Sequence, residues 1–205
     1  MNIAVFASGR GSNFQAILHA IESGLLSARI TVLISNKSDA GAMEIARAHN
    51  IPTSHLSQKL FQKEDALAEA MLNVLTKQRT ECIVLAGYLK KIPVQVIRRF
   101  RNKIINIHPA LLPSFGGAGM YGHFIHEAVI ASGVKISGAT VHLVDEEYDR
   151  GPIVMQKTVE VVQKDTPESL AKKVLTVEHE IFPIAVKALV EGKVKVEGKK
   201  AWIMS

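Results

Sequence analysis

Asn106 and His108 stand two positions apart in the stretch NIHPALLPSF, residues 106–115, at the end of an apolar run. Residues two apart in a strand face the same side, so the amide and the imidazole would reach one substrate atom together. Both groups can donate hydrogen bonds to an oxyanion, and an imidazole also exchanges protons near neutral pH. The plainer alternative is a pair of satisfied polar residues at a strand end. The pair by itself indicates a catalytic site without establishing one.

Two further segments carry groups that suit an anionic substrate. The segment ASGRGSN, residues 7–13, is glycine-rich: Gly9 and Gly11 allow a tight turn, and the next amides would begin a helix and favour a phosphate. The segment DEEYDRGP, residues 145–152, offers carboxylates beside a Gly-Pro turn. Taken alone, residues 7–13 could be merely a tight turn, and residues 145–152 could be a solvated acidic loop. Together with the 106–108 pair they indicate a two-substrate transferase acting on a phosphorylated metabolite.

Alternating strand and helix patterns must position these segments. Apolar runs predict strands, and apolar residues at helical spacing predict helices. The expected strands are 2–8, 28–36, 51–56, 82–87, 104–108, 137–144 and 152–162. The expected helices are 14–24, 40–50, 63–78, 93–100, 124–132 and 166–192. Ser12 or Asn13 is expected to cap the first helix and Thr166 the last, and residues 193–204 read as a hairpin. This order predicts one α/β domain with a mostly parallel central sheet and a C-terminal antiparallel portion. Ligands of such sheets bind at the carboxyl ends of the strands, where the three polar segments fall.

Composition excludes several classes of protein. The chain has 205 residues, is 47% hydrophobic and carries a formal charge of +6, so it can bury its own core. Its apolar runs are too short to span a membrane and no signal peptide is recognised, so a cytoplasmic protein is expected. The basic residues are spread out and only 5% of residues are aromatic, which disfavours nucleic-acid binding. The eight histidines are scattered and the single cysteine, Cys82, reads as core, so no metal site is expected.

Five segments together resemble the phosphoribosylglycinamide formyltransferases, the folate-dependent enzymes of purine biosynthesis: NIAVFASGRGSN, VLAGYLKKI, IINIHPALLPSF, SGATVHLVDEEYDRGPIVMQ and VEHEIFP. The likeness covers nearly the whole chain, from residue 2 to the region of Trp202. It implies a Rossmann-like three-layer fold in one formyltransferase domain over 1–205, with a ribonucleotide-binding part at 1–100 and a catalytic and folate-binding part at 101–205. It also implies formyl transfer from 10-formyltetrahydrofolate to glycinamide ribonucleotide (GAR), without a metal, by a cytoplasmic monomer or homodimer that contacts neither nucleic acid nor membrane.

The resemblance assigns a role to each matched residue. The implied catalytic residues are Asn106, His108 and Asp149. The implied GAR-binding residues are Gly11, Ser12, Asn13 and Glu178. The implied folate-binding residues are Tyr88, Leu89, Lys90, Lys91, Ile92, Asn106, Asp145 and Asp149. Asp149 is expected to raise the pKa of His108 by ion pairing and to help route a proton through water.

The sequence departs from the family pattern in three places. Residues 115–123 form a longer, glycine-rich loop, expected to be a flexible lid or rim. The arginine that many members carry before the third helix has only Lys63 near its place, and Lys90 stands where an arginine is common. Lysine keeps the charge but lacks the planar fork that grips a carboxylate, so these changes predict altered folate affinity and unchanged chemistry.

Other activities compete with this reading. Two other enzymes of the same fold, methionyl-tRNA formyltransferase and formyltetrahydrofolate hydrolase, usually carry an additional domain. This sequence begins at its first strand and ends shortly after AWIM, so neither additional domain is expected. A non-catalytic phosphate-binding module would not need Asn106, His108 and Asp149 together. A dinucleotide-dependent oxidoreductase is disfavoured because the first loop lacks the third glycine and Asn36, not an acidic residue, ends the second strand.

Overall fold

The computed structural model describes residues 1–204, which divide into two compact units. Unit 1 comprises Met1–Asn106, and unit 2 begins at Ile107. The division falls inside a single strand, β5 (Ile104–His108), so Asn106 and His108 share a strand but belong to different units.

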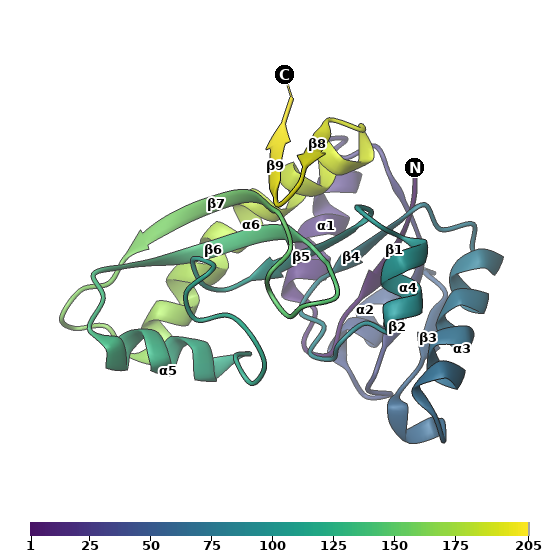
Figure 1. Cartoon of the computed structure of the whole chain (residues 1–205), viewed down its shortest axis with the longest axis horizontal. Coiled ribbons are helices and arrows are strands. Elements are labelled where there is room, and N and C mark those ends of the chain that lie inside the picture. Colours follow the sequence, from purple (N-terminus) through teal and green to yellow (C-terminus); the bar gives the residue numbers. More distant parts are fainter. Residues whose placement is uncertain (205) are drawn as a thin grey trace. The chain divides into compact units, whose positions relative to one another are not determined.

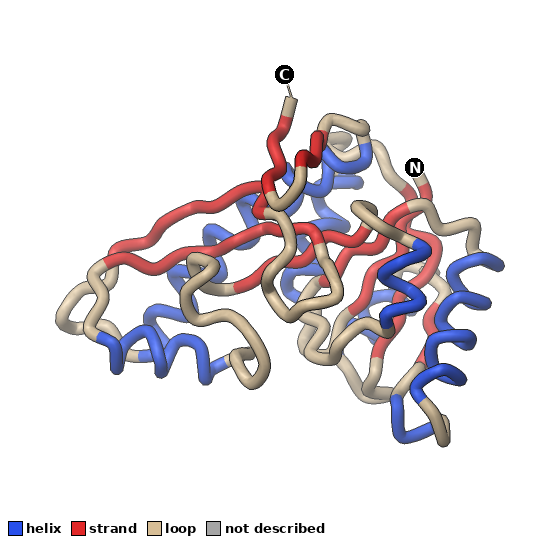
Figure 2. The backbone as a smooth tube through the Cα atoms, viewed as in Figure 1, coloured by secondary structure: helices blue, strands red, loops and turns tan. Residues whose placement is uncertain are grey.

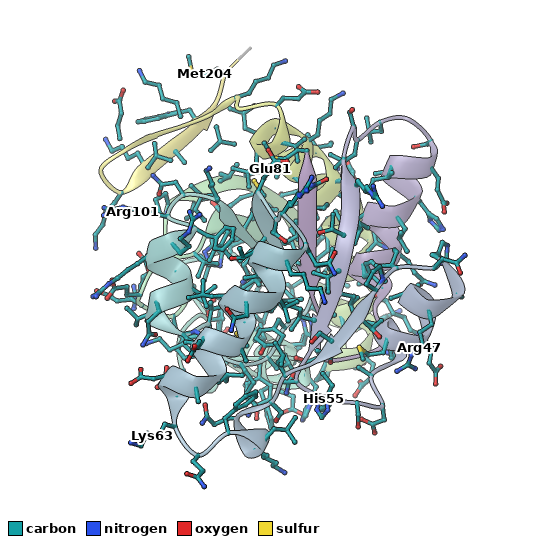
Figure 3. The ribbon with its side chains drawn as sticks, turned by 90° about the vertical axis from the view of Figure 1, so that its right-hand side faces the viewer. Arg47, His55, Lys63, Glu81, Arg101 and Met204 are labelled. Atoms are coloured by element: carbon teal, nitrogen blue, oxygen red, sulfur yellow. The ribbon has the colours of Figure 1, made fainter. Side chains whose placement is uncertain are left out.

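Unit 1 is a parallel sheet covered by helices on both faces. Its strands lie in the order β3-β2-β1-β4-β5, all parallel, where β1 is Asn2–Phe6, β2 is Arg29–Ser35, β3 is Thr53–His55 and β4 is Cys82–Leu85. Figure 3 shows α3 (Glu64–Lys77) and α4 (Val94–Arg99) on one side of the strands, and α1 (Ser12–Glu22) and α2 (Gly41–Ala48) on the other. Because both faces are covered, β1, β2 and β4 are almost continuously apolar and buried.

Unit 2 is built around an antiparallel pair of strands. β6 (Ile136–Leu143) pairs antiparallel with β7 (Ile153–Glu160), and β7 pairs in parallel with β9 (Lys200–Ile203). β9 forms an antiparallel hairpin with β8 (Val194–Glu197). The long helix α6 (Pro167–Val190) packs on β6 and β7, and α5 (His123–Ser132) packs against α6 (Figure 1). Two long loops, residues 109–122 and 144–152, carry most of the remaining chain (Figure 2).

The predicted fold class is confirmed. Every predicted strand and helix is present within a few residues of its expected bounds, and the C-terminal strands are antiparallel apart from the β7–β9 pair. Thr166 is the N-cap of α6 as predicted, because its side chain accepts from the Ser169 amide at 3.2 Å. The short 3-10 helix η1 (Gln58–Leu60) was not predicted, since three residues are too few for a periodic signal.

The predicted cap of the first helix is wrong. Gly11, not Ser12 or Asn13, is the N-cap of α1, with φ of 88°, and no side chain caps that end of the helix. A residue in the left-handed region turns the chain so sharply that Ser12 already lies inside the helix. The start of α1 is therefore left without a side-chain cap.

No helix within residues 1–204 combines the length and the apolar character that crossing a membrane requires.

Candidate functional site

The register of unit 1 brings three predicted segments to one edge of the sheet. Phe6 pairs with Leu85, and Leu85 pairs with Asn106, so neighbouring parallel strands end at the same level. The loop after β1, residues 7–13, and the segment after β4, residues 86–92, therefore leave the sheet at the edge where Asn106 lies. This is the carboxyl edge, at which open parallel sheets bind ligands.

Ser8 holds the first loop against the segment after β4. Its hydroxyl accepts a hydrogen bond from the Leu89 amide at 2.9 Å and donates one to Asn36 Oδ1 at 2.5 Å. Its own amide donates to the Gly87 carbonyl at 3.0 Å. Ser8 is almost fully buried, so these bonds are shielded from water and rigid. The sequence analysis did not single out Ser8, although a hydroxyl directly after an apolar strand was a visible signal.

Gly11 is required by both backbone and packing. Besides its φ of 88°, a Cβ added at residue 11 would lie 2.9 Å from Ala42 Cα and 3.0 Å from Ile45 Cδ1 on α2. Gly9, in contrast, has open space around it and ordinary φ, so the turn does not depend on it. The first turn of α1 contains no acidic residue. An open helix start without a carboxylate favours an anion.

The predicted folate residues of unit 1 differ in exposure. Tyr88 packs edge-on against Phe6, with ring centroids 5.3 Å apart, and Ile92 is buried. Leu89 is 40% exposed, and Lys90 and Lys91 are exposed. The segment thus offers an anchored aromatic ring beside cationic groups in solvent. Lys63, the residue nearest to the missing arginine, is exposed at the N-cap position of α3.

In unit 2, His108 and Asp149 lie together as predicted. His108 Nδ1 is 3.6 Å from Asp149 Oδ2, and the side chains are only 4% and 11% exposed. His108 Nε2 is 2.8 Å from the Phe115 carbonyl oxygen, which can only accept, so Nε2 carries the proton. The imidazole is therefore held between two acceptors, with its Nδ1 directed at the carboxylate.

Asp149 has two other partners, neither of which was predicted. Its Oδ2 accepts from the Gly117 amide at 2.9 Å, and its Oδ1 lies 3.6 Å from His142 Nε2. Both Asp149 and Phe115 have φ of 54°, an uncommon conformation for residues with a side chain. Such backbone outliers concentrate at functional sites, where the surrounding contacts maintain them.

Burial decides the protonation of this cluster. Burial lowers the pKa of His108, although Asp149 and the Phe115 carbonyl act to raise it and His142 lowers it further. Asp149 does favour the charged imidazole, as predicted, but burial of the ring outweighs this effect and the pKa of His108 is lowered overall. Burial also raises the pKa of Asp149, yet the His142 hydrogen bond, the His108 charge and the Gly117 amide outweigh it, and the pKa is lowered. An ionised Asp149 thus faces a largely neutral His108 at neutral pH.

The segment that follows His108 is fixed by two side chains from β6 and β7. Thr140 Oγ1 donates to the Ala110 carbonyl at 2.6 Å and accepts from the Leu112 amide at 3.0 Å. Gln156 Nε2 donates to both the Leu112 carbonyl and Thr140 Oγ1 at 2.9 Å. Neither Thr140 nor Gln156 was predicted. Thr140 and His142 alternate with apolar residues in SGATVHLV, and buried polar residues at a period of two were the available signal.

The glycine-rich loop is attached to the site at one end. A Cβ at Gly116 would lie 2.5 Å from Leu112 Cδ2 and 3.1 Å from Asp149 Cβ, so any side chain there would displace Leu112 and press on Asp149. With the Gly117 bond, this joins the start of the expected lid to the carboxylate. Asp145 accepts from the Glu147 amide at 2.9 Å, which closes a local turn. Glu178 is a buried carboxylate on α6, 7% exposed.

The predicted residues thus fall into one group in each unit. Unit 1 presents an anion-favouring helix start, the 88–92 segment and Asn106 at one sheet edge. Unit 2 presents a buried imidazole whose protonated form is matched by a carboxylate and a carbonyl. A neutral imidazole with such partners can accept a proton and hold it, which is the behaviour of a general acid–base.

Comparisons with known proteins identify relatives over most of the chain. Residues 1–186 match the family described as formyl transferase. A phosphoribosylglycinamide formyltransferase of Arabidopsis thaliana chloroplasts is 44% identical over 194 residues, or 94% of this chain, and this chain spans 66% of its length. That of Bacillus subtilis is 38% identical, with 91% of this chain and 93% of the relative covered. Among solved structures, glycinamide ribonucleotide transformylase 1 from Symbiobacterium toebii superposes with a TM-score of 0.94 at 34% identity, covering 100% of this chain and 94% of that one.

Proposed function

Because this chain belongs to the formyl transferase family, we propose that it transfers the formyl group of 10-formyltetrahydrofolate to the amino group of GAR. The products are formyl-GAR and tetrahydrofolate, in purine biosynthesis. The observation that carries the proposal is the buried pair of His108 and Asp149, with Nδ1 and Oδ2 3.6 Å apart. The relatives named above, among them the Bacillus subtilis formyltransferase, support the choice of substrates.

The reaction requires one group to stabilise negative charge and another to move a proton. The GAR amine attacks the formyl carbon, the bond from that carbon to the folate nitrogen breaks, and one proton passes from the amine to that nitrogen. Negative charge collects meanwhile on the formyl oxygen. Asn106 and His108, two apart on β5, present an amide donor and an imidazole donor on one side of the strand. Loss of one such donor costs about 3 to 4 kcal/mol of transition-state stabilisation.

His108 and Asp149 serve the proton transfer. The lowered pKa keeps His108 neutral, with its proton on Nε2. The ring can then take a second proton at Nδ1, where the Asp149 carboxylate stabilises the imidazolium once it forms. The proton on Nε2 is bonded to the Phe115 carbonyl, which must give up this bond before Nε2 can donate to an oxyanion. Movement of the 115–117 segment is therefore part of the proposed cycle.

Substrate binding is assigned to the remaining residues. Gly11, Ser12 and Asn13 would hold the GAR phosphate at the open start of α1, and Glu178 would bind the same substrate. The folate would contact residues 88–92 together with Asp145 and Asp149. No metal takes part in the proposed reaction, and the enzyme would act in the cytoplasm, as a monomer or homodimer, without nucleic-acid or membrane partners.

The deciding experiment follows tetrahydrofolate formation from 10-formyltetrahydrofolate with and without GAR. We expect turnover only with GAR. Turnover without GAR would identify a hydrolase instead, and no turnover in either condition would exclude a transferase. His108→Ala should lower kcat by roughly 10²- to 10⁴-fold. His19→Ala, at an exposed position of α1, is the matched control and should keep wild-type kcat.

A further inference from the structure

Unit 2 contains a pocket that has only Asp149 in common with the residues of the proposed reaction. Its volume is about 510 Å³, within the usual range for small-molecule sites. Three basic side chains, an indole and apolar groups line it: Arg150, Lys199, Lys200, Trp202, Leu112 and Ile153. Asp149 also reaches its wall. The pocket thus lies beside the carboxylate that pairs with His108.

The C-terminal hairpin closes the pocket. Lys200 is in register with Ile153 where β9 runs parallel to β7, which brings the hairpin alongside the end of the 144–152 loop (Figure 1). A Cβ at Gly151 would lie 1.8 Å from the Leu143 carbonyl oxygen, so the loop returns against β6 and fixes the backbone next to Arg150. Two backbone contacts therefore hold the pocket wall in place: the pairing of β9 with β7 and the close approach of Gly151 to Leu143.

The pocket has an excess of positive charge. Within residues 1–204, no carboxylate lies in ion-pair range of Arg150, Lys199 or Lys200, whereas Glu197 of the same hairpin is occupied by Lys195 at 2.8 Å. Three cationic groups therefore stand against one carboxylate, Asp149, which already faces two histidines. A phosphate monoester carries about −1.5 to −2 charges at neutral pH and matches that excess. Arg150 adds the planar fork that binds phosphate oxygens in pairs.

Trp202 supplies an aromatic surface next to these charges. It is the single tryptophan of the chain and is 45% exposed. Nucleic-acid bases stack on such rings without regard to sequence. We propose that this pocket binds a nucleoside monophosphate, with the base against Trp202 and the phosphate on Arg150, Lys199 and Lys200. GAR does not meet this description, because it has a phosphate but no aromatic base.

The single tryptophan makes the proposal directly measurable. We would titrate the full-length protein with AMP and follow the fluorescence of Trp202. We expect a saturable change, with adenosine and ribose 5-phosphate each binding at least about tenfold more weakly than AMP. The double substitution of Lys199→Ala and Lys200→Ala should weaken AMP binding by about tenfold or more. Lys172→Ala, at an exposed position of α6 outside the pocket, should bind AMP like the wild type.

His108→Ala separates this pocket from the catalytic site. It should abolish most formyl transfer yet retain the AMP-dependent change in fluorescence. No response of Trp202 at millimolar AMP would overturn the proposal, as would equal binding of AMP by the double variant. A response to folic acid but not to AMP would also overturn it, because the pocket would then belong to the folate site.

Discussion

One carboxylate, Asp149, lies between two imidazoles: His142 Nε2 is 3.6 Å from Oδ1, and His108 Nδ1 is 3.6 Å from Oδ2. His142 is itself oriented by the Leu143 carbonyl, which lies 2.9 Å from Nδ1. The two histidines come from different strands, β6 and β5, and the carboxylate comes from the loop after β6. His142 can therefore influence the proton on His108 through the carboxylate that the two rings share.

His142→Ala should change the pH profile of the reaction. The hydrogen bond from His142 lowers the pKa of Asp149, so its removal raises that pKa. The acid limb of kcat against pH should move to higher pH, whereas kcat at neutral pH should stay near wild type, because Asp149 remains ionised there. The KM for GAR should stay near wild type. A purely structural role for His142 would lower stability and leave the acid limb in place.

Ser12→Asp should raise the KM for GAR. A carboxylate at the start of α1 interacts favourably with the helix dipole and so does not destabilise the fold. It repels the substrate phosphate, and a penalty of about 1.4 kcal/mol would raise KM about tenfold. Ser12→Asn is the uncharged control of similar size. If both variants keep the wild-type KM in steady-state assays, the phosphate binds elsewhere.

Gly11→Ala should destabilise the protein, whereas Gly9→Ala should not. The first places a Cβ against α2 and holds alanine at φ of 88°, and strain of that kind costs about 1 to 3 kcal/mol. The second meets open space at an ordinary φ and should change stability by no more than about 0.5 kcal/mol. Urea unfolding of the two variants measures the difference. Equal stability of both would show that the Gly11 contact with Ala42 is not maintained in solution.

Thr140→Val tests whether the segment after His108 is held by β6. The substitution keeps the shape but removes the hydroxyl that bonds Ala110 and Leu112, at a cost of roughly 1 to 3 kcal/mol for the buried groups left unpaired. We also expect a lower kcat, because His108 begins the segment that is released. Thr158→Val, exposed on β7, is the control for stability and rate. Unchanged unfolding midpoints for Thr140→Val would contradict the anchoring role.

Asp165 should make stability depend on pH in the acid range. The Lys173 hydrogen bond, the Val162 amide and Ser169 lower the pKa of Asp165 from 3.8 to about 2. Since the folded-state pKa is the lower one, the stabilisation is complete above about pH 4 and is lost as pH falls toward about 2. Asp165→Asn should remove this step from a plot of unfolding free energy against pH. Lys173→Met should narrow the window, because the largest cause of the lowered pKa is gone.

The sequence by itself predicted the elements and named the candidate residues of the site. Strand and helix periodicity predicted nearly all elements, because local patterns report which side of an element is buried. The spacing in NIHPALLPSF predicted that Asn106 and His108 face one side of a strand, and the family resemblance added Asp149 of DEEYDRGP to them. The structure brings His108 and Asp149 together, as the sequence predicted.

Tertiary structure decided the partners of those residues and their electrostatics. The contacts of Ser8 with Leu89, of Phe115 with His108 and of His142 with Asp149 join residues that are 7 to 81 positions apart in the sequence. No local sequence pattern encodes such contacts. The pKa of His108 fell although its carboxylate partner was predicted, because burial depends on everything that packs around the ring. The left-handed Gly11, which left the start of α1 uncapped, was fixed by its contact with α2. Spacing along the chain can name the groups of a site, but packing sets their charge and their neighbours.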